Sequence, residues 1–177
     1  VETTSNVVKT AIWVLGKATQ VKTVSSCFLI FPKSHEPMIY ADCGLVIEPN
    51  DEELVDITIA ASQSCKSLLN TDPRIALLSF STKGSAKHRN TDKILSALKK
   101  LKSLEPELLV DGELQFDAAL DSAVGKIKAP ESKVAGTANV MIFPNLDAGN
   151  IAYKITQRLG NADAYGPILQ GLEKPAN

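Results

Sequence analysis

Short, uninterrupted apolar segments alternate with helix-like segments along most of this chain. Strands are predicted at residues 24–31, 38–41, 74–80, 108–110, 139–143 and 165–169. Helices are predicted at residues 8–16, 49–68, 90–104, 116–124 and 149–159, where apolar residues recur at helical spacing. Strands that lack polar alternation are buried on both faces. The pattern therefore predicts a three-layer α/β/α fold with a mostly parallel sheet.

Two local signals refine this prediction. The first two strands are separated only by a short segment bounded by Pro32 and Pro37, so they are expected to be hairpin-like neighbours and to make the sheet mixed. The second helix has a strong start signal, with Asn50 as a cap before three acidic residues. In the last helix, Ile151 and Ile155 align on one face and predict an amphipathic element.

Composition places the chain among ordinary globular domains. It has 177 residues, 44% hydrophobic and 22% charged, with a net charge of −1. A single domain is expected, and the near-neutral charge gives no reason to expect nucleic acid or a membrane as a partner. No apolar run approaches the roughly 20 residues that a membrane helix needs. The cytoplasm is the expected compartment.

Cysteine and histidine usage argues against disulfide and nucleophilic chemistry. Cys27, Cys43 and Cys65 are scattered without a C-x-x-C spacing, as expected for reduced, buried thiols. His35 and His88 are not near a nucleophile in any recognisable motif, so both are predicted to lie at the surface.

Ligands of open α/β sheets bind beyond the carboxyl ends of the strands, and four segments follow predicted strands. Residues 81–87, Ser-Thr-Lys-Gly-Ser-Ala-Lys, could hold a phosphate, although they lack the Walker A pattern and could equally form a polar surface turn. Residues 111–113, Asp-Gly-Glu, could do acid–base work or form a solvated turn or a helix cap. No His or Cys accompanies them at ligand spacing, so no metal site is expected.

The other two segments contain glycines. In residues 143–150, Gly149 would let a ligand approach the backbone, and a helix beginning there would offer free N–H groups to an anion. The alternative is a capped connection with Asn145 or Asp147 as the cap. Residues 165–171 contain two glycines and a proline, which indicate a shaped turn more than a plain strand.

A basic cluster covers the third predicted helix and the loop before it. It could receive a phosphorylated ligand, or it could be a solvated helix face, because several of its lysines lie away from the apolar stripe. Its members are Lys83, Lys87, His88, Arg89, Lys93, Lys99, Lys100 and Lys102, opposed only by Asp92.

Together these segments resemble the phosphate acetyltransferase family. The matching stretches are PRIALLSFSTKGSA at 73–86, DGELQFDAA at 111–119, IFPNLDAGNIAYK at 142–154 and GPILQGL at 166–172, with KTVSS at 22–26 and YADC at 40–43. They occur in the family's order from about residue 3 to the last residue, and they cover about half of a family member.

The resemblance implies reversible transfer of an acetyl group between acetyl phosphate and coenzyme A, with coenzyme A as a substrate and no bound cofactor. It implies an isocitrate/isopropylmalate dehydrogenase-like fold, two domains with the site in the cleft between them, and a homodimer. Residues 1–177 would then be one α/β domain, the second domain of a two-domain acyltransferase, and residues 1–16 and 170–177 would connect it to the missing domain.

The resemblance also implies which contacts this chain supplies. The family's Ser-Arg pair lies in a D-L-S-R-G motif after K-P-x-N, so that pair and a later aspartate fall beyond Asn177, and no catalytic residue is expected here. Substrate-binding positions are expected at the first helix and along the cleft. They are Thr4, Lys9, Gly149, Asn150, Gly166, Pro167 and Ile168.

Three alternatives remain open at this point. A phosphate butyryltransferase would share the same motifs. A non-catalytic dimerisation or ligand-binding module is favoured only by Lys9, which replaces the family's arginine and cannot grip phosphate bidentately. A dehydrogenase relative is poorly supported, because Gly-x-Gly-x-x-Gly is absent.

Overall fold

The computed structural model of the chain describes Thr10, Val14 and residues 22–172, so the predicted helix at 8–16 lies largely outside the described residues. The strands are β1 (Ser25–Phe31), β2 (Met38–Ala41), β3 (Ile75–Leu78), β4 (Val110–Leu114), β5 (Val140–Ile142) and β6 (Asp163–Gln170). The helices are α2 (Asp51–Leu69), α3 (Arg89–Leu104), α4 (Phe116–Leu120), α5 (Ser122–Lys128) and α6 (Leu146–Arg158).

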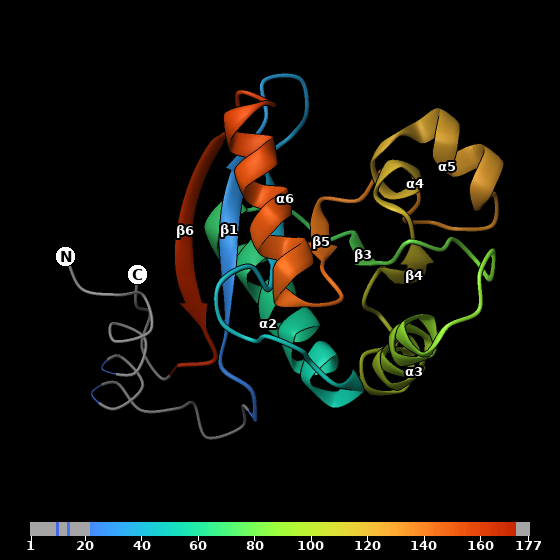
Figure 1. Cartoon of the computed structure of the whole chain (residues 1–177), viewed down its shortest axis with the longest axis horizontal. Coiled ribbons are helices and arrows are strands. Elements are labelled where there is room, and N and C mark those ends of the chain that lie inside the picture. The colour runs from blue at the N-terminus through green and yellow to red at the C-terminus, as the bar shows by residue number, and fades with distance from the viewer. Residues whose placement is uncertain (1–9, 11–13, 15–21, 173–177) are drawn as a thin grey trace.

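The six strands form one mixed sheet in the order β4-β3-β5-β2-β1-β6 (Figure 1). The β4-β3-β5-β2 part is parallel, whereas β1 is antiparallel to both β2 and β6. The predicted hairpin-like pair is confirmed, with Phe28 opposite Tyr40. A mostly parallel, mixed sheet is therefore confirmed as well.

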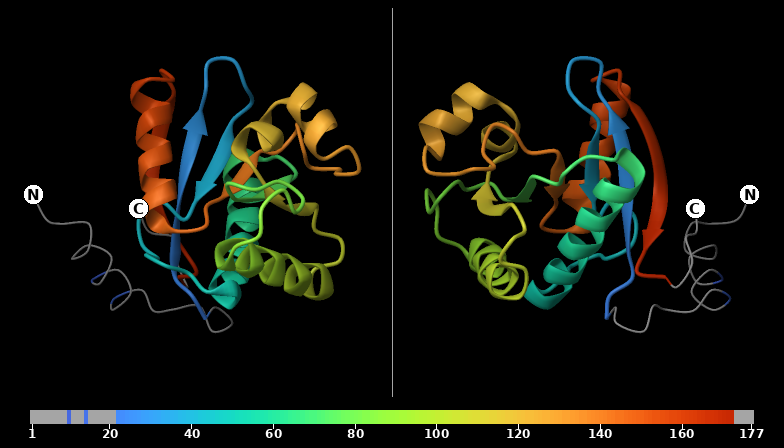
Figure 2. Two further views of the ribbon diagram at one scale, coloured as in Figure 1. Left: turned by 45° about the vertical axis from the view of Figure 1, so that its right-hand side comes forward. Right: turned by 180° about the vertical axis from the view of Figure 1, so that it is seen from behind.

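Helices cover both faces of the sheet, which confirms the three layers. On β2, Ile39 and Ala41 point into a core shared with α2 and α3, and Met38 and Tyr40 point into a second core with α4 and α6. α6 lies on the near side of the sheet in Figure 1 and on the far side in the right-hand view of Figure 2. This alternation explains why the strands are apolar throughout.

Helix boundaries follow local capping chemistry. Asn50 caps α2 and forms a capping box with Glu53, as the start signal predicted. The predicted single helix at 116–124 is wrong, because Asp121 adopts an extended conformation (φ −90°, ψ 122°) and caps a second helix, α5. An aspartate that can accept from the N–H groups of Ala123 and Val124 competes with helix continuation.

Candidate functional site

The carboxyl ends of five strands lie at one edge of the sheet. β2, β3, β4 and β5 are parallel, and β6 shares their direction because β1 lies antiparallel between β2 and β6. After the adjacent strands β2 and β5 the chain leaves toward opposite faces, through α2 on one side and α6 on the other. Such a switch point is where open α/β sheets bind ligands. The candidate site therefore surrounds the segments that follow β2 and β5.

The segment after β2 is a tight turn built around Asp42. Its carboxylate accepts hydrogen bonds from the backbone N–H groups of Gly44 at 2.8 Å, Leu45 at 3.2 Å and Val46 at 2.9 Å. The hydroxyl of Ser26 on β1 donates to the same carboxylate. Because its carboxylate accepts these four hydrogen bonds, Asp42 holds the turn in place.

Gly149 lies in the first turn of α6 and packs against this turn. The prediction that a helix begins at Gly149 with free N–H groups is wrong. α6 begins at Leu146 after its cap Asn145, one of the two expected caps, and the Gly149 N–H donates to the Asn145 carbonyl at 3.3 Å. A Cβ on Gly149 would lie 2.2 Å from the carbonyl oxygen of Asp42 and 3.1 Å from the Sγ of Cys43. The close approach that requires glycine is to the protein's own backbone.

Asn150 and Pro167 reach the same turn from two other elements. The Asn150 side chain donates to the carbonyl of Cys43 at 3.0 Å and accepts from Lys154 Nζ at 2.7 Å. A Cβ on Gly44 would lie 3.5 Å from the Cβ of Pro167, so β6 also borders the turn. The fold thus brings Gly149, Asn150 and Pro167 together around the segment after β2.

The other expected contacts lie elsewhere. Gly166 packs against the ring of Phe28, because a Cβ on Gly166 would lie 2.8 Å from the ring atoms Cγ and Cδ1. Ile168 is partly buried against the core on the α2 side. Both belong to β6, which confirms the predicted strand at 165–169. The shaped turn predicted for 165–171 is wrong, although the pairing with β1 does shift register there. Thr4 and Lys9 lie outside the described residues.

The Asp-Gly-Glu segment lies inside β4, which corrects the prediction of a strand at 108–110 followed by a solvated turn. Asp111 is 7% exposed and Glu113 is 1% exposed. Lys83 forms an ion pair with Asp111, and the hydroxyl of Ser81 donates to Oε1 of Glu113 at 2.8 Å. Burial raises the pKa of Asp111, but the hydrogen bonds from Lys83, Ser132 and the Gly112 N–H together with the Lys83 charge outweigh it, so that pKa lies below its usual value.

The loop after β3 uses its own backbone donors, which removes the basis for a phosphate cradle. The N–H groups of Lys83 and Gly84 donate to the carbonyl and to Oε1 of Glu113. The N–H groups of Thr82, Ser85 and Ala86 donate within the loop, to Oγ of Ser85, the carbonyl of Thr82 and Oγ of Ser81, respectively. Phosphate cradles need free N–H groups. The two candidate segments therefore satisfy each other, and among the described residues only Oε2 of Glu113 is buried without a hydrogen-bond partner.

Two members of the basic cluster pair with α2 and the loop before it. Lys93 binds Glu48 at 2.8 Å, and Lys100 binds Asp51 at 2.9 Å. The hydroxyl of Ser96 also donates to Asp51, and this contact, followed by Lys100, lowers the pKa of Asp51. These pairs fasten α3 to α2, so this part of the cluster has a structural role.

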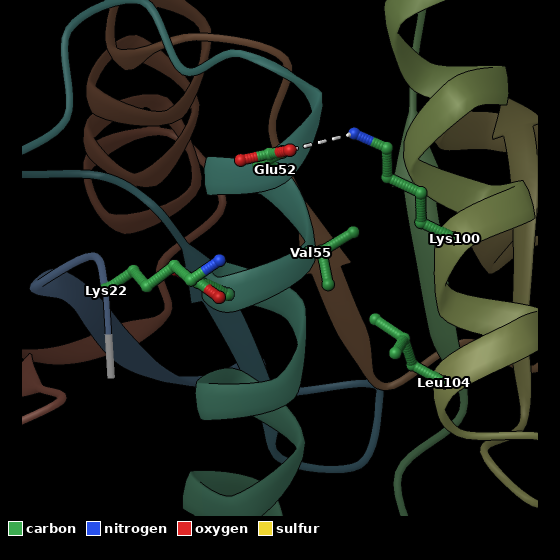
Figure 3. A pocket seen from close by; sticks show the side chains of 6 residues that line it. Lys22, Glu52, Val55, Lys100 and Leu104 are labelled. Atoms are coloured by element: carbon green, nitrogen blue, oxygen red, sulfur yellow. Dashed lines mark ion pairs between the residues drawn. The ribbon is translucent and has the colours of Figure 1, made fainter. Parts of the chain in front are cut away.

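A small cavity lies between the same two helices (Figure 3). It measures about 150 Å³ and is lined by Lys22, Glu52, Val55, Asp56, Lys100 and Leu104. Lys100 and Glu52 approach to 3.6 Å across it. Ligand pockets typically measure about 300–1,000 Å³. The cavity is therefore too small for a nucleotide-sized ligand.

The cysteines are buried free thiols, which confirms their structural assignment. Burial raises the pKa of Cys27 to about 12 and that of Cys65 to about 11, and it raises the pKa of Cys43 well above the usual range. None is a thiolate near neutral pH. Within the described part of the chain, no group of three or more His, Cys, Asp or Glu residues could hold a metal ion. No helix there is long and apolar enough to cross a membrane.

The turn after β2 is a site element that was not predicted from the sequence. Asp42 and Gly44 follow a predicted strand, so the geometric rule that selected the other four segments would have selected this one too. The short strand and the Asp-Cys-Gly sequence after it were the available signal.

The three α/β/α layers, with a switch point between β2 and β5, define an open-sheet α/β domain. Residues 1–177 match the family described as "Phosphate acetyl/butaryl transferase". The chain is 50% identical over 182 residues to the phosphate acetyltransferase of Paracoccus denitrificans, which covers all of this chain and 57% of that protein. The chain therefore belongs to this family.

Solved structures agree with this assignment. A phosphotransacetylase from Streptococcus pyogenes superposes with a TM-score of 0.93 at 44% identity, over 99% of this chain and 53% of that chain. The 4-hydroxythreonine-4-phosphate dehydrogenase of Klebsiella pneumoniae has a TM-score of 0.55 at 12% identity, over 94% and 47%, a likeness of fold alone that agrees with a dehydrogenase-like architecture. The chain spans about half the length of the curated relatives it matches.

Proposed function

We propose that this chain is one lobe of a phosphate acetyltransferase, which transfers an acetyl group reversibly between acetyl phosphate and coenzyme A. The observation that carries the proposal is the 50% identity to a phosphate acetyltransferase over the entire chain. The share of that relative that is covered, 57%, supports a second lobe elsewhere in the protein. The protein is proposed to act in the cytoplasm as a homodimer.

The described residues support a division of labour between the lobes. At the turn after β2 the thiol of Cys43 is protonated, and the carboxylate of Asp42 accepts hydrogen bonds from the turn's own backbone, so neither group is proposed as the nucleophile or the base. The thiolate of coenzyme A would attack the acetyl carbonyl directly, forming the C–S bond as the C–O bond to phosphate breaks. The thiol proton would pass to a carboxylate of the other lobe. That lobe would also supply the Ser-Arg pair.

This lobe would contribute a preformed wall for the substrates. The proposed substrate contacts are Thr4, Lys9, Gly149, Asn150, Gly166, Pro167 and Ile168. Three of these border the turn after β2, at the switch point of the sheet. Holding that turn through Asp42 keeps the wall in one geometry. Preorganised positioning is one of the larger contributions to acyl transfer.

Acetyl-coenzyme A formation by the intact gene product and by residues 1–177 alone tests the proposal. The intact protein should be active and the 177-residue chain should be inactive. Equal activity of the two would contradict the division between lobes. Activity with butyryl phosphate but not acetyl phosphate would assign a butyryltransferase, and activity with neither would favour a non-catalytic module.

A further inference from the structure

The segments that follow β2 and β5 run past each other in opposite directions at the candidate site. At the start of the first segment, Asp42 packs against Gly149 of the second. Further along, the carbonyl of Ile47 accepts a hydrogen bond of 3.0 Å from the N–H of Leu146. Early residues of one segment thus meet later residues of the other. These two segments, residues 42–50 and 143–150, together form the wall described above.

The far end of this pair contains two prolines. Pro49 closes the first segment and Pro144 lies near the start of the second, and proline has no N–H to donate. Lys93 of α3 supplies donors at this end. Its ammonium donates to the carbonyl of Pro144 at 2.9 Å and pairs with the carboxylate of Glu48 at 2.8 Å. One cation therefore joins both segments where their backbones have fewer donors.

Lys93 projects from a fixed platform. Its neighbour Ile94 is fully buried in the core on the α2 side of the sheet. Ser96 and Lys100 hold α3 to Asp51 of α2. The Lys93 side chain itself is only 17% exposed, so it is confined between its two acceptors. A side chain that is locked by its surroundings can set the separation of two segments.

The second bond of Lys93 has no part in joining α3 to α2. The pair with Glu48 fastens α3 to the loop before α2, whereas Pro144 directly precedes Asn145, the cap of α6. α6 and α3 cover opposite faces of the sheet. Lys93 therefore connects the two helical layers across the carboxyl edge of the sheet, beside the switch point.

We propose that Lys93 is a positioning residue for the acetyl transfer. Its ammonium clamps the segment after β2 to the segment after β5, and thereby fixes where α6 begins beside the site. The inference rests on the proposed function, because Gly149 and Asn150 in the first turns of α6 are among its proposed substrate contacts. Lys93 acts through these two residues and is not assigned a contact with the substrates.

Lys93→Met in the intact gene product tests the proposal, since methionine keeps an aliphatic stem and loses both hydrogen bonds. The value of kcat should fall by about 10- to 100-fold, with KM for coenzyme A within about threefold of wild type, because a displaced wall misaligns substrates that still bind. Lys93→Arg keeps the charge and the donors, and should recover at least about a third of the wild-type kcat.

Lys100→Met is the matched control. Lys100 lies on the same helix, but its partners Asp51 and Glu52 belong to α2 and not to the wall (Figure 3). Each variant removes ion pairing between α3 and the α2 side, so each should lower the melting temperature by about 4 °C or less. The control should keep the wild-type kcat.

Hydrogen exchange read by mass spectrometry follows the clamp without the reaction. The N–H groups within residues 43–48 and 143–150 should exchange about tenfold faster or more in Lys93→Met, because the loss of charge-assisted hydrogen bonds loosens both segments. They should be unchanged in Lys100→Met.

Equal kcat values for Lys93→Met and Lys100→Met, no recovery in Lys93→Arg, or unchanged exchange in Lys93→Met would overturn the proposal. A wild-type protein that transfers no acetyl group is instead a failure of the proposed function. The exchange comparison then decides on its own whether Lys93 clamps the wall.

Discussion

Gly149→Ala is the sharpest test of how α6 is held at the candidate site. Helix propensity alone predicts that the change stabilises the protein by about 1 kcal/mol, because glycine is the worse helix former. The structure predicts the opposite. The added Cβ would lie 2.2 Å from the Asp42 carbonyl oxygen, whereas ordinary contacts begin at 3.4 Å, so α6 and the turn must separate by about 1 Å.

The expected loss follows from that displacement. The new Cβ would clash with the backbone oxygen of Asp42, in a turn that the Asp42 side chain holds in place. The free-energy cost of overpacking should therefore be near the upper end of its usual range, about 3 kcal/mol. Subtracting the propensity gain leaves a net loss of about 2 kcal/mol. For a chain of this size that corresponds to a fall in melting temperature of about 4–8 °C. In the intact protein, a 1 Å shift of the turn should lower kcat/KM by roughly 10- to 100-fold.

Thermal unfolding and alkylation of Cys43 together measure the effect. The new methyl group would contact Sγ of Cys43, so the displaced turn should expose this thiol. Gly84→Ala is the control, because a Cβ there meets no atom within 4 Å, although its φ of +82° still disfavours alanine. The control should lose some stability while Cys43 stays protected. A Gly149→Ala protein that melts at or above the wild-type temperature would refute the reasoning.

Three further predictions follow from the polar contacts. Asp42→Ala leaves its four donors without an acceptor and should lower the free energy of unfolding by about 3 kcal/mol, measured in urea; a loss below about 1 kcal/mol would contradict the assigned role. The lowered pKa of Asp111 contributes stability above about pH 4 that is lost as the pH falls further. The stability difference between wild type and Asp111→Asn should therefore shrink from about pH 7 to about pH 3, and a constant difference would count against the ion pair. The raised thiol pKa values of Cys27, Cys43 and Cys65 predict no alkylation of the native protein at about pH 8 and modification of all three after unfolding, as read by mass spectrometry.

The layers and the strand directions could be predicted because burial on both faces leaves a continuous apolar pattern. The extent of β4 could not be predicted, because the Asp-Gly-Glu sequence at 111–113 is typical of a turn. Asp111 and Glu113 are tolerated in a buried strand only because Lys83 and Ser81 come from a loop about 30 residues away. A pairing of that kind leaves no local signal in the sequence.

The candidate site was predicted in part for a related reason. Gly149 was predicted because its segment follows a strand and Asn150 through the family resemblance, and both lie at the switch point. Their contacts with the turn after β2 depend on how α6 crosses the sheet, which spacing alone does not specify. The same limitation applies to Ile155, whose helical spacing predicts an apolar face but does not say whether that face meets the core or another molecule.

The pairing of Ser25 with Gln170 has a mechanical consequence. The first residue of β1 and the last residue of β6 are partners in the sheet, and their side chains are joined by a hydrogen bond of 3.2 Å. The chain therefore enters and leaves the sheet at neighbouring points. A pull on either connection is therefore carried by the paired strands β1 and β6 together.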